Sequence, residues 1–352
     1  VRKGRDYQNS KVESSDEVEL SRDAQLGIRD YAPGSQTVAA KSLWDSVGIY
    51  IPPSKSLEKN DWFECSGCGA FWETKNPFDS TCPVCMNAQN TKAGIPYVRP
   101  EFGFIGKKST DKPGETRPSS IGFLQSFFSD FEGNAPAVQQ VEVHGLTLEV
   151  RQSRQGRITV INRGREARGF LLCEVCGFCK PSPSVKELGK KRQNSSMAPT
   201  HLFMGVGPND CKSRSMLKHV SLGHYYLTDA VEISFPGHLL VQENAQSVLA
   251  SLLAATPSLG IGQREMNGSI RPISGGNSII LFDTVPGGAG YATLAAAKLE
   301  ELFDEAVEVS RRCPDCGLDS SCYGCLRTYQ NQRHHENLER RLALDVFNKF
   351  PG

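Results

Sequence analysis

The feature that most constrains this chain is the spacing of its twelve cysteines, most of which stand in C-x2-C pairs. The first cluster has Cys65, Cys68, Cys82 and Cys85, with the spacing C-x2-C-x13-C-x2-C. Tetrahedral zinc takes four thiolates at about 2.3 Å, and two short knuckles joined by a hairpin supply them. Gly69 suits the first knuckle, because glycine tolerates the backbone angles that point amides at sulfur. The cluster therefore predicts a structural zinc site of the zinc-ribbon type.

A second complete set lies near the C-terminus and consists of Cys313, Cys316, Cys322 and Cys325. Its spacing is C-x2-C-x5-C-x2-C. Five residues between the pairs leave no room for a hairpin of real length. We therefore expect a structural zinc site that joins the end of the preceding helix to the last segment of the chain.

The middle cluster offers five candidate ligands for four positions. Cys173 and Cys176 form a knuckle, Cys179 follows closely, and His201 and Cys211 come later. We favour a zinc site of Cys173, Cys176, His201 and Cys211, because Cys179 follows Cys176 so closely that a tetrahedral arrangement of both is strained. Cys179 in place of His201 remains open.

The predicted cofactor is thus zinc at three structural sites. A catalytic zinc keeps one coordination position open, whereas a site of four cysteines is closed. The sequence shows no apolar secretory signal, so we expect the thiolates to bind zinc in the reducing cytoplasm. The longest apolar stretch, residues 248–261, is broken by Pro257 and is too short for a bilayer, so no membrane association is expected.

The predicted fold class is an α+β multi-module protein, with a zinc-ribbon-like and β-rich N-terminal part and an α/β C-terminal zinc-binding domain. Apolar residues alternate over 141–150, which predicts strands with a hairpin turn near Gly156. Helices are expected over 245–255, 291–311 and 337–347, and a buried strand over 278–285. The predicted divisions are a tail and β-rich segment (1–60), a zinc-ribbon-like module (61–95), a β-rich segment (96–170), a second zinc module (171–235) and the C-terminal domain (236–352).

No motif for ATP hydrolysis or another catalytic site is apparent, and no cofactor-binding residue besides the zinc ligands is predicted. Gly103–Ser109 resembles a P-loop, but its glycine spacing is wrong and Lys108 stands where a hydroxyl is needed, so an ordinary loop is expected. A glycine-rich turn, Asp283–Tyr291, joins a predicted strand to a predicted helix. Such a turn can receive a phosphate, but a tight turn that needs small residues is favoured.

The net charge is +1, with 40 basic and 39 acidic residues, so a surface for nucleic acid requires local clusters. Six arginines fall within residues 151–168 beside the one acid Glu166, and a second cluster follows Cys325. A solvated surface, or packing of the last helix on the zinc knuckle, is the alternative. The candidate DNA contacts are Arg151, Arg154, Arg157, Arg163, Arg327 and Arg333.

Two C-terminal stretches, Ile279–Tyr291 and Cys325–Arg333, closely resemble the MrfA-type zinc-binding domain. That domain closes many large superfamily 2 DNA helicases and also occurs in DrmB of the DISARM antiphage system. Upstream, Ile28–Ser35, Leu222–His224 and Thr228–Ala230 fit the same pattern.

The resemblance implies a region that assists DNA engagement by a helicase motor, in the same polypeptide or in a partner, during antiphage defence or DNA repair. The expected partners are therefore DNA and a superfamily 2 motor. The alternative is a zinc scaffold that docks a helicase without contacting DNA.

Overall fold

The structure is a computed structural model that describes residues 2–3, 20–74, 81–87, 95–111, 113–114, 124–184, 211, 217–237 and 239–349. Its strands are β1 (Arg2–Lys3), β2 (Gln36–Ala39), β3 (Ser42–Ile49), β4 (Lys59–Glu64), β5 (Phe71–Thr74), β6 (Tyr97–Val98), β7 (Phe104–Lys108), β8 (Leu124–Phe131), β9 (Gln139–Val143), β10 (Leu146–Asn162), β11 (Phe170–Leu172), β12 (Cys179–Pro181), β13 (Lys218–Ser234), β14 (Met266–Ile273) and β15 (Gly276–Asp283). Its helices are α1 (Ala24–Asp30), α3 (Gln242–Ala255), α4 (Tyr291–Ala297), α5 (Leu299–Arg311) and α6 (Arg340–Phe347), with 3-10 turns η1 (Arg165–Ala167), η2 (Thr256–Leu259) and η3 (Gln332–Asn337).

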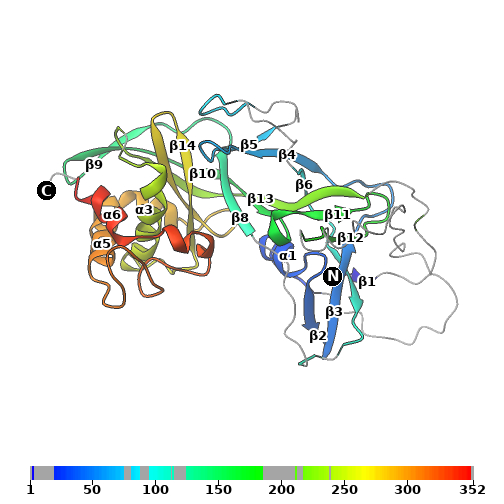
Figure 1. Ribbon diagram of the computed structural model, residues 1–352. Coiled ribbons are helices and arrows are strands. Elements are labelled where there is room, and N and C mark those ends of the chain that lie inside the picture. Colours follow the sequence, from blue (N-terminus) through cyan, green and yellow to red (C-terminus); the bar gives the residue numbers. More distant parts are fainter. Residues whose placement is uncertain are drawn as a thin grey trace.

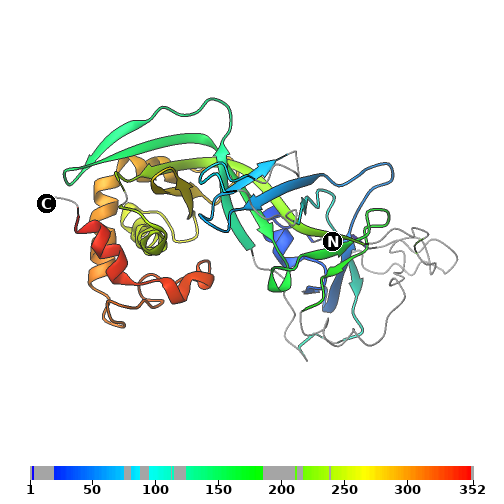
Figure 2. The ribbon, with the colours of Figure 1, turned by 45° about the horizontal axis from the view of Figure 1, so that its top comes forward.

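One eleven-stranded sheet connects the two ends of the molecule (Figures 1 and 2). Its two longest strands, β10 and β13, run antiparallel from Glu149 opposite Ser234 to Asn162 opposite Leu222. The C-terminal half of β13 pairs with β15, and its N-terminal half pairs with β11 and β6. The same strand therefore belongs to the helical end and to the end that carries the first two cysteine clusters. The predicted mixture of β-rich and α/β parts is confirmed.

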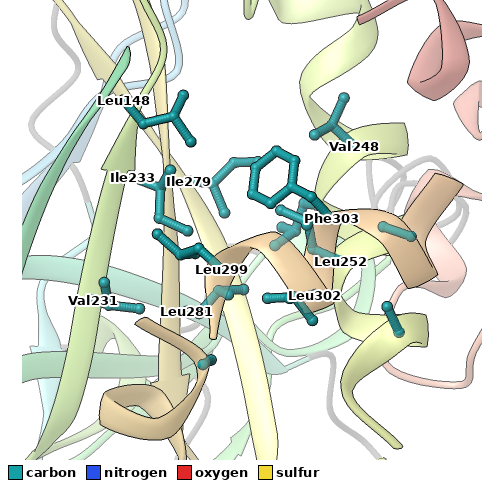
Figure 3. Close-up of a cluster of buried hydrophobic side chains, with 14 of the residues drawn as sticks. Leu148, Val231, Ile233, Val248, Leu252, Ile279, Leu281, Leu299, Leu302 and Phe303 are labelled. Carbon is teal, nitrogen blue, oxygen red and sulfur yellow. The ribbon is translucent and has the colours of Figure 1, made fainter. Parts of the chain in front are cut away.

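Helices α3, α5 and α6 cover one face of this sheet (Figure 1). Figure 3 shows apolar side chains of α3 and α5 packed against Leu148, Val231 and Ile279 of the sheet. Strand β15 is buried on both faces, since Ile279 and Leu281 join this core while Ile280 and Phe282 join a second core on the other side. An uninterrupted apolar run such as Ile279–Phe282 suits a strand covered on both faces.

The predicted helix over 291–311 is divided in the structure. Helix α4 ends at Ala297 and α5 begins at Leu299, with Lys298 at φ −123° and ψ 39° between them. Both helices place apolar residues at helical spacing on the core side, so the pattern alone does not show the break. The expected final helix begins later than predicted, at Arg340, because η3 takes residues 332–337.

The predicted hairpin turn near Gly156 is wrong. Strand β10 continues through Gly156, where its register with β13 shifts, and the turn lies instead at His144–Gly145 between β9 and β10. A Cβ on Gly156 would lie 2.4 Å from the Ala230 Cβ, so glycine is needed here for close strand approach. A single glycine inside a run of strand residues, as at Gly156, is the sequence pattern of a bulge.

The loop predicted over Gly103–Ser109 is wrong for most of its length. Phe104–Lys108 form β7, which pairs with β3 in a four-stranded sheet of order β1-β7-β3-β2. Phe104 and Ile105 are buried there, which explains why this segment pairs rather than loops out. Among the described residues, no helix is both long and apolar enough to cross a membrane.

Candidate metal centres and the cleft between two of them

The first centre lies where β4 ends and β5 begins. The Cys65 and Cys85 sulfurs are 3.5 Å apart, and those of Cys68 and Cys82 are 3.6 Å apart. All four sulfurs lie within 4.8 Å of one another. A tetrahedron with Zn–S bonds of about 2.3 Å has S···S edges of about 3.8 Å, so the four thiols fit one zinc ion.

Backbone amides point at these sulfurs, as expected for zinc knuckles. The N–H groups of Gly67 and Cys68 donate to the Cys65 sulfur at 3.4 and 3.5 Å. Burial raises the pKa of the Cys65 thiol, but these amides and the neighbouring thiols lower it to about 7. Gly69 has φ +78°, the conformation that the sequence predicted for it. The local backbone therefore stabilises a thiolate, which is the form that binds metal.

The third centre is formed between α5 and the segment that leads to α6. Cys313 and Cys322 have sulfurs 3.5 Å apart, and those of Cys316 and Cys325 are 3.7 Å apart. The buried side chain of Arg340 donates to the carbonyl oxygens of Ser310 at 3.0 Å, Arg311 at 3.3 Å and Cys316. Arg340 thus ties the knuckle to the end of α5 and the start of α6.

The middle centre brings three cysteines together. The sulfurs of Cys173, Cys176 and Cys211 lie within 4.8 Å of one another, with Cys173 and Cys211 3.9 Å apart. Cys179 is not in this group: it lies in β12, within the apolar core, where burial raises the pKa of its thiol. His201 lies outside the described residues. All twelve cysteines fall in the described part of the chain, and all are free of disulfides. The protein therefore has three zinc sites.

A cleft of about 680 Å³ lies between the first and third centres. Cys68 and Gly69 of the first centre and Tyr323 and Cys325 of the third centre line it. Helices α1 and α3, strands β8 and β14, and residues 327–334 supply the remaining walls. The two centres thus border one cavity, although their cysteines are far apart in sequence.

Three of the six arginines predicted as DNA contacts meet in this cleft: Arg163, Arg327 and Arg333. Arg163 lies 5.3 Å from the centre of the Trp62 ring and pairs with Glu64 at 3.0 Å. Arg327 donates to the Ser321 hydroxyl at 3.0 Å, and Arg333 donates to His334 at 2.8 Å. The cleft therefore concentrates positive charge from two distant segments.

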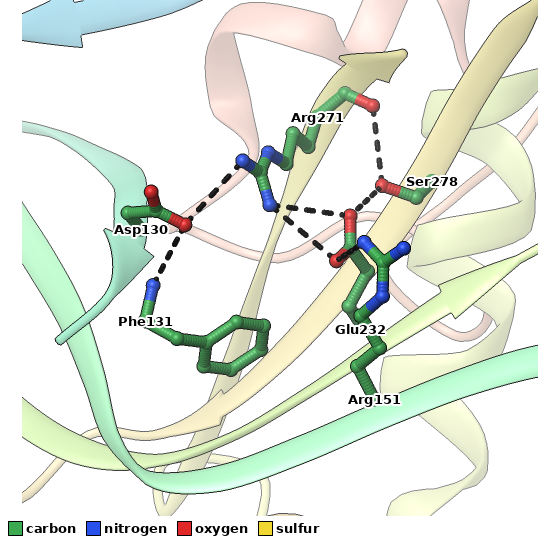
Figure 4. Close-up of polar contacts among 6 residues, drawn as sticks. All are labelled: Asp130, Phe131, Arg151, Glu232, Arg271 and Ser278. Carbon is green, nitrogen blue, oxygen red and sulfur yellow. Dashed lines mark hydrogen bonds and ion pairs between the residues drawn. The ribbon is translucent and has the colours of Figure 1, made fainter. Parts of the chain in front are cut away.

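The other three predicted arginines lie outside the cleft. Arg151 pairs at 3.4 Å with Glu232, a carboxylate that is 1% exposed and also contacts Arg271 and Ser278 (Figure 4). Arg157 pairs with two glutamates and stacks 3.8 Å from the Tyr225 ring centre, so its charge is used within the fold. Arg154 is exposed on β10.

Backbone N–H groups of the glycine-rich turn form hydrogen bonds within the turn itself. The Asp283 carboxylate accepts from the backbone N–H of Ala289 at 2.6 Å, Tyr291 at 3.1 Å and Ala292 at 2.7 Å. These are the groups that would otherwise face a phosphate at a helix N-terminus. The tight-turn interpretation of Asp283–Tyr291 is therefore confirmed.

Sequence analysis missed several cleft residues. Arg29 and Glu64 belong to no cluster of charged residues in the sequence. Many side-chain amides could not be recognised as neighbours, because they come from separate elements. The amides are those of Gln25, Gln125, Gln242, Gln246, Gln263, Asn267, Gln330, Asn331 and Gln332. Tyr323 could have been recognised, because a large aromatic side chain between two knuckle cysteines has little hydrophobic core to pack into.

Residues 246–326 match the MrfA Zn-binding domain, which confirms the resemblance for this part of the chain. Over 364 aligned residues the chain is 23% identical to the Druantia protein DruE of Escherichia coli (strain UMEA 4076-1). That alignment covers 91% of this chain and 19% of DruE, so the chain spans about a fifth of its relative.

Similar solved structures include the DUF1998 helicase MrfA bound to DNA, with 13% identity and a TM-score of 0.37. This similarity covers 73% of the present chain and 29% of that one. The same helicase bound to DNA and AMPPNP gives 11% identity and a TM-score of 0.30, over 72% of this chain and 26% of that one.

Proposed function

We propose that this chain is a zinc-scaffolded, DNA-engaging accessory region of an ATP-dependent superfamily 2 DNA helicase or helicase complex. It acts in the cytoplasm in antiphage defence or DNA repair, and it contains no motor of its own. The motor is in the same polypeptide or in a separate subunit. The helicase context is supported by the match of residues 246–326 to the MrfA Zn-binding domain.

The observation that carries the proposal is the charge of the cleft between the first and third centres. Arg29, Arg163, Arg327 and Arg333 line it, and among its described lining residues Glu64 is the one acid. Arg29 pairs with Asp30 at 2.9 Å and Arg163 pairs with Glu64, so the excess of positive charge comes from Arg327 and Arg333. In a chain of net charge +1, such a local excess is what a polyanion requires. Zinc centres on both sides fix the backbone, which reduces the entropy lost on binding.

For the metal sites we propose the four cysteines of the first and third centres as complete ligand sets. His201 completes the middle site with Cys173, Cys176 and Cys211. A His201→Ala variant should lose about one of three zinc equivalents in elemental analysis, because three thiolates alone hold zinc less well. Cys179→Ser should keep all three. The reverse result would assign Cys179 as the fourth ligand.

The direct test is titration of fluorescent single-stranded and duplex DNA with the chain at two salt concentrations. Phosphate contacts predict binding that weakens steeply with salt. A variant with Arg163→Glu and Arg333→Glu should bind more weakly and with a flatter salt dependence. Arg154→Glu, exposed on β10 outside the cleft, is the matched control and should bind nearly as wild type. Equal loss in both variants would place the DNA surface elsewhere.

The alternative function is a scaffold that docks a helicase partner without touching DNA. It is favoured by exposed apolar side chains beside two centres, Met86 at 71% and Val175 at 61% exposure. A partner that covered these two side chains would remove their apolar surface from water. Under this alternative the chain binds neither form of DNA at low salt.

A further inference from the structure

Two exposed aromatic rings stand at the cleft beside the third centre. Tyr323 is 67% exposed and Tyr329 is 75% exposed, and both line the cleft. Large aromatic side chains are costly to leave in water unless they have a partner to cover them. Packing against the last helix therefore does not account for either ring.

The segment that carries these rings is held in place by its own hydrogen bonds. The Asn331 side chain donates to the Leu326 carbonyl at 2.8 Å and accepts from the Thr328 amide at 2.8 Å. His335 contacts the Thr328 carbonyl at 2.9 Å and meets the Tyr323 ring edge-on at 5.3 Å. The zinc knuckle and this network together fix the backbone that carries the rings, which reduces the backbone entropy lost on binding.

The charged groups of the cleft converge on one place. Loss of surrounding water lowers the pKa of Arg333; the Glu64 carboxylate raises it, and the Arg163 charge lowers it again. Arg163, Arg333 and Glu64 all line this cleft, and Glu64 is the partner of Arg163 at 3.0 Å. A phosphate has the same charge sign and the same paired oxygens as this carboxylate.

The chemistry of the walls fits unpaired bases better than a double helix. Tyrosine rings stack on the faces of bases, and in a duplex those faces are covered by neighbouring bases. The many side-chain amides of the cleft can both donate to and accept from base edges. A cavity of about 680 Å³ is of the size that encloses small ligands.

We propose that this cleft binds one unpaired nucleic-acid strand, with bases stacked on Tyr323 and Tyr329. Its phosphates contact Arg327 and Arg333, and Arg163 exchanges Glu64 for a phosphate when the strand enters. The inference rests on the proposed function and names the form of nucleic acid that the same site takes.

The first experiment uses the whole 352-residue chain and a fluorescein-labelled 15-nucleotide oligothymidylate, with a blunt 15-base-pair duplex as the comparison. Tyr329→Ala and Tyr323→Ala should each weaken strand binding about tenfold, since a stacked base contributes roughly that factor. Tyr329→Phe keeps the ring and should stay within about twofold of wild type. Zinc content and melting temperature are measured for every variant.

The second experiment tests the exchange at Arg163. Glu64→Gln removes the competing carboxylate, so strand binding should tighten several-fold. Adding Arg163→Met to this variant should weaken strand binding by a larger factor than Arg163→Met does in the wild-type chain. Glu132→Gln is the matched control: its carboxylate pairs with Arg157 at 3.1 Å, is similarly exposed, and lies outside the cleft. It should leave strand binding unchanged.

The outcomes separate this inference from the proposed function. If neither strand nor duplex binds at low salt, the proposed function fails and the inference fails with it. If the duplex binds as tightly as the strand and the tyrosine variants bind like wild type, DNA engagement stands and the single-strand cleft is overturned. Tighter binding by Glu132→Gln as well as Glu64→Gln would overturn the exchange at Arg163.

Discussion

The two four-cysteine centres border one cleft, but they are supported differently. The first rests on the short β4–β5 pair, and its apolar cluster consists mainly of its own cysteines with Ala70, Trp72 and Val84. The third is packed against Ala250, Leu326 and Leu338, and Arg340 joins it to α5 and α6. Similar cysteine pairs therefore serve beside a pair of sheet strands in one case and as part of a helical core in the other.

The largest difference between the two centres is expected when one zinc ligand is removed from each. Cys325→Ser should cost on the order of 5 kcal/mol and disorder the C-terminal helices, because lost zinc is lost folding energy and this centre is part of the helical core. Cys85→Ser should lose one zinc with much less effect on the global melting temperature. Elemental analysis with circular dichroism melting measures both. Equal melting temperatures would mean that the supports do not differ.

The next prediction tests the buried arginine of the third centre. Arg340→Met should cost about 3 kcal/mol, since three carbonyl oxygens lose their donor in a buried place. Arg341→Met is the matched control: Arg341 is half-exposed and pairs with Asp319, so its loss should cost far less than the loss of Arg340. Urea unfolding and zinc retention against a chelator measure the difference. Retained zinc and unchanged stability in Arg340→Met would contradict the role given to this residue.

His334, which lines the cleft, is expected to make the folding stability depend on pH. Burial, the Arg333 charge and His335 together lower the pKa of His334 to about 4. Because the unfolded side chain titrates near 6.5, stability is full above that value and is lost as the pH falls from about 6.5 towards 4. After a discount for solvent screening, the expected loss of unfolding free energy is about 1 to 2 kcal/mol.

His334→Gln isolates that contribution from the titration of the zinc ligands themselves. Its unfolding free energy should fall less than that of wild type between pH 6.5 and pH 5, as followed by urea unfolding at each pH. The Cys85→Ser variant provides the control, since it keeps His334 and should keep this part of the slope. A constant difference between His334→Gln and wild type across this range would show that the folded pKa is ordinary.

The smallest prediction compares glycines in the same knuckle position. Gly69 follows Cys68 and has φ +78°, whereas Gly317 follows Cys316 and is not among the residues with positive φ. A Cβ at either place meets nothing closer than 3.8 Å. Gly69→Ala should therefore cost about 1 kcal/mol from backbone strain alone, and Gly317→Ala should cost almost nothing. Matched melting curves measure the pair; equal costs would remove this distinction between the knuckles.

Much of the local structure could be predicted from the sequence. Apolar residues alternate over 141–150, which is the pattern of a half-buried strand. The continuous apolar run of β15 is the pattern of a strand that is buried on both faces. The errors arose where partners far away in the chain decide the outcome. Gly156 is a bulge because β13 approaches it closely, and Phe104–Lys108 form a strand because β3 lies beside them. Neither neighbour is visible in a short window of sequence.

The arginine cluster at 151–168 shows the same limit at the site. Six positive charges in one stretch gave no sign of which would be neutralised, because their acidic partners come from β5, β13, the end of β4 and the residue after β8. Tertiary contacts paired Arg151 and Arg157 within the fold and turned Arg163 into the cleft beside Arg333. Charge clustering along the chain is thus a poor guide to charge clustering in space.

The sequence by itself determined the cysteine knuckles, because two ligands three residues apart already define half of a tetrahedral site. It did not determine that the first and third centres border one cleft. That arrangement depends on β10, β13 and α3 bringing segments from opposite ends of the chain together, and it is fixed by packing of the whole core. Metal binding is local geometry here, whereas the shape and charge of the cleft are properties of the folded chain.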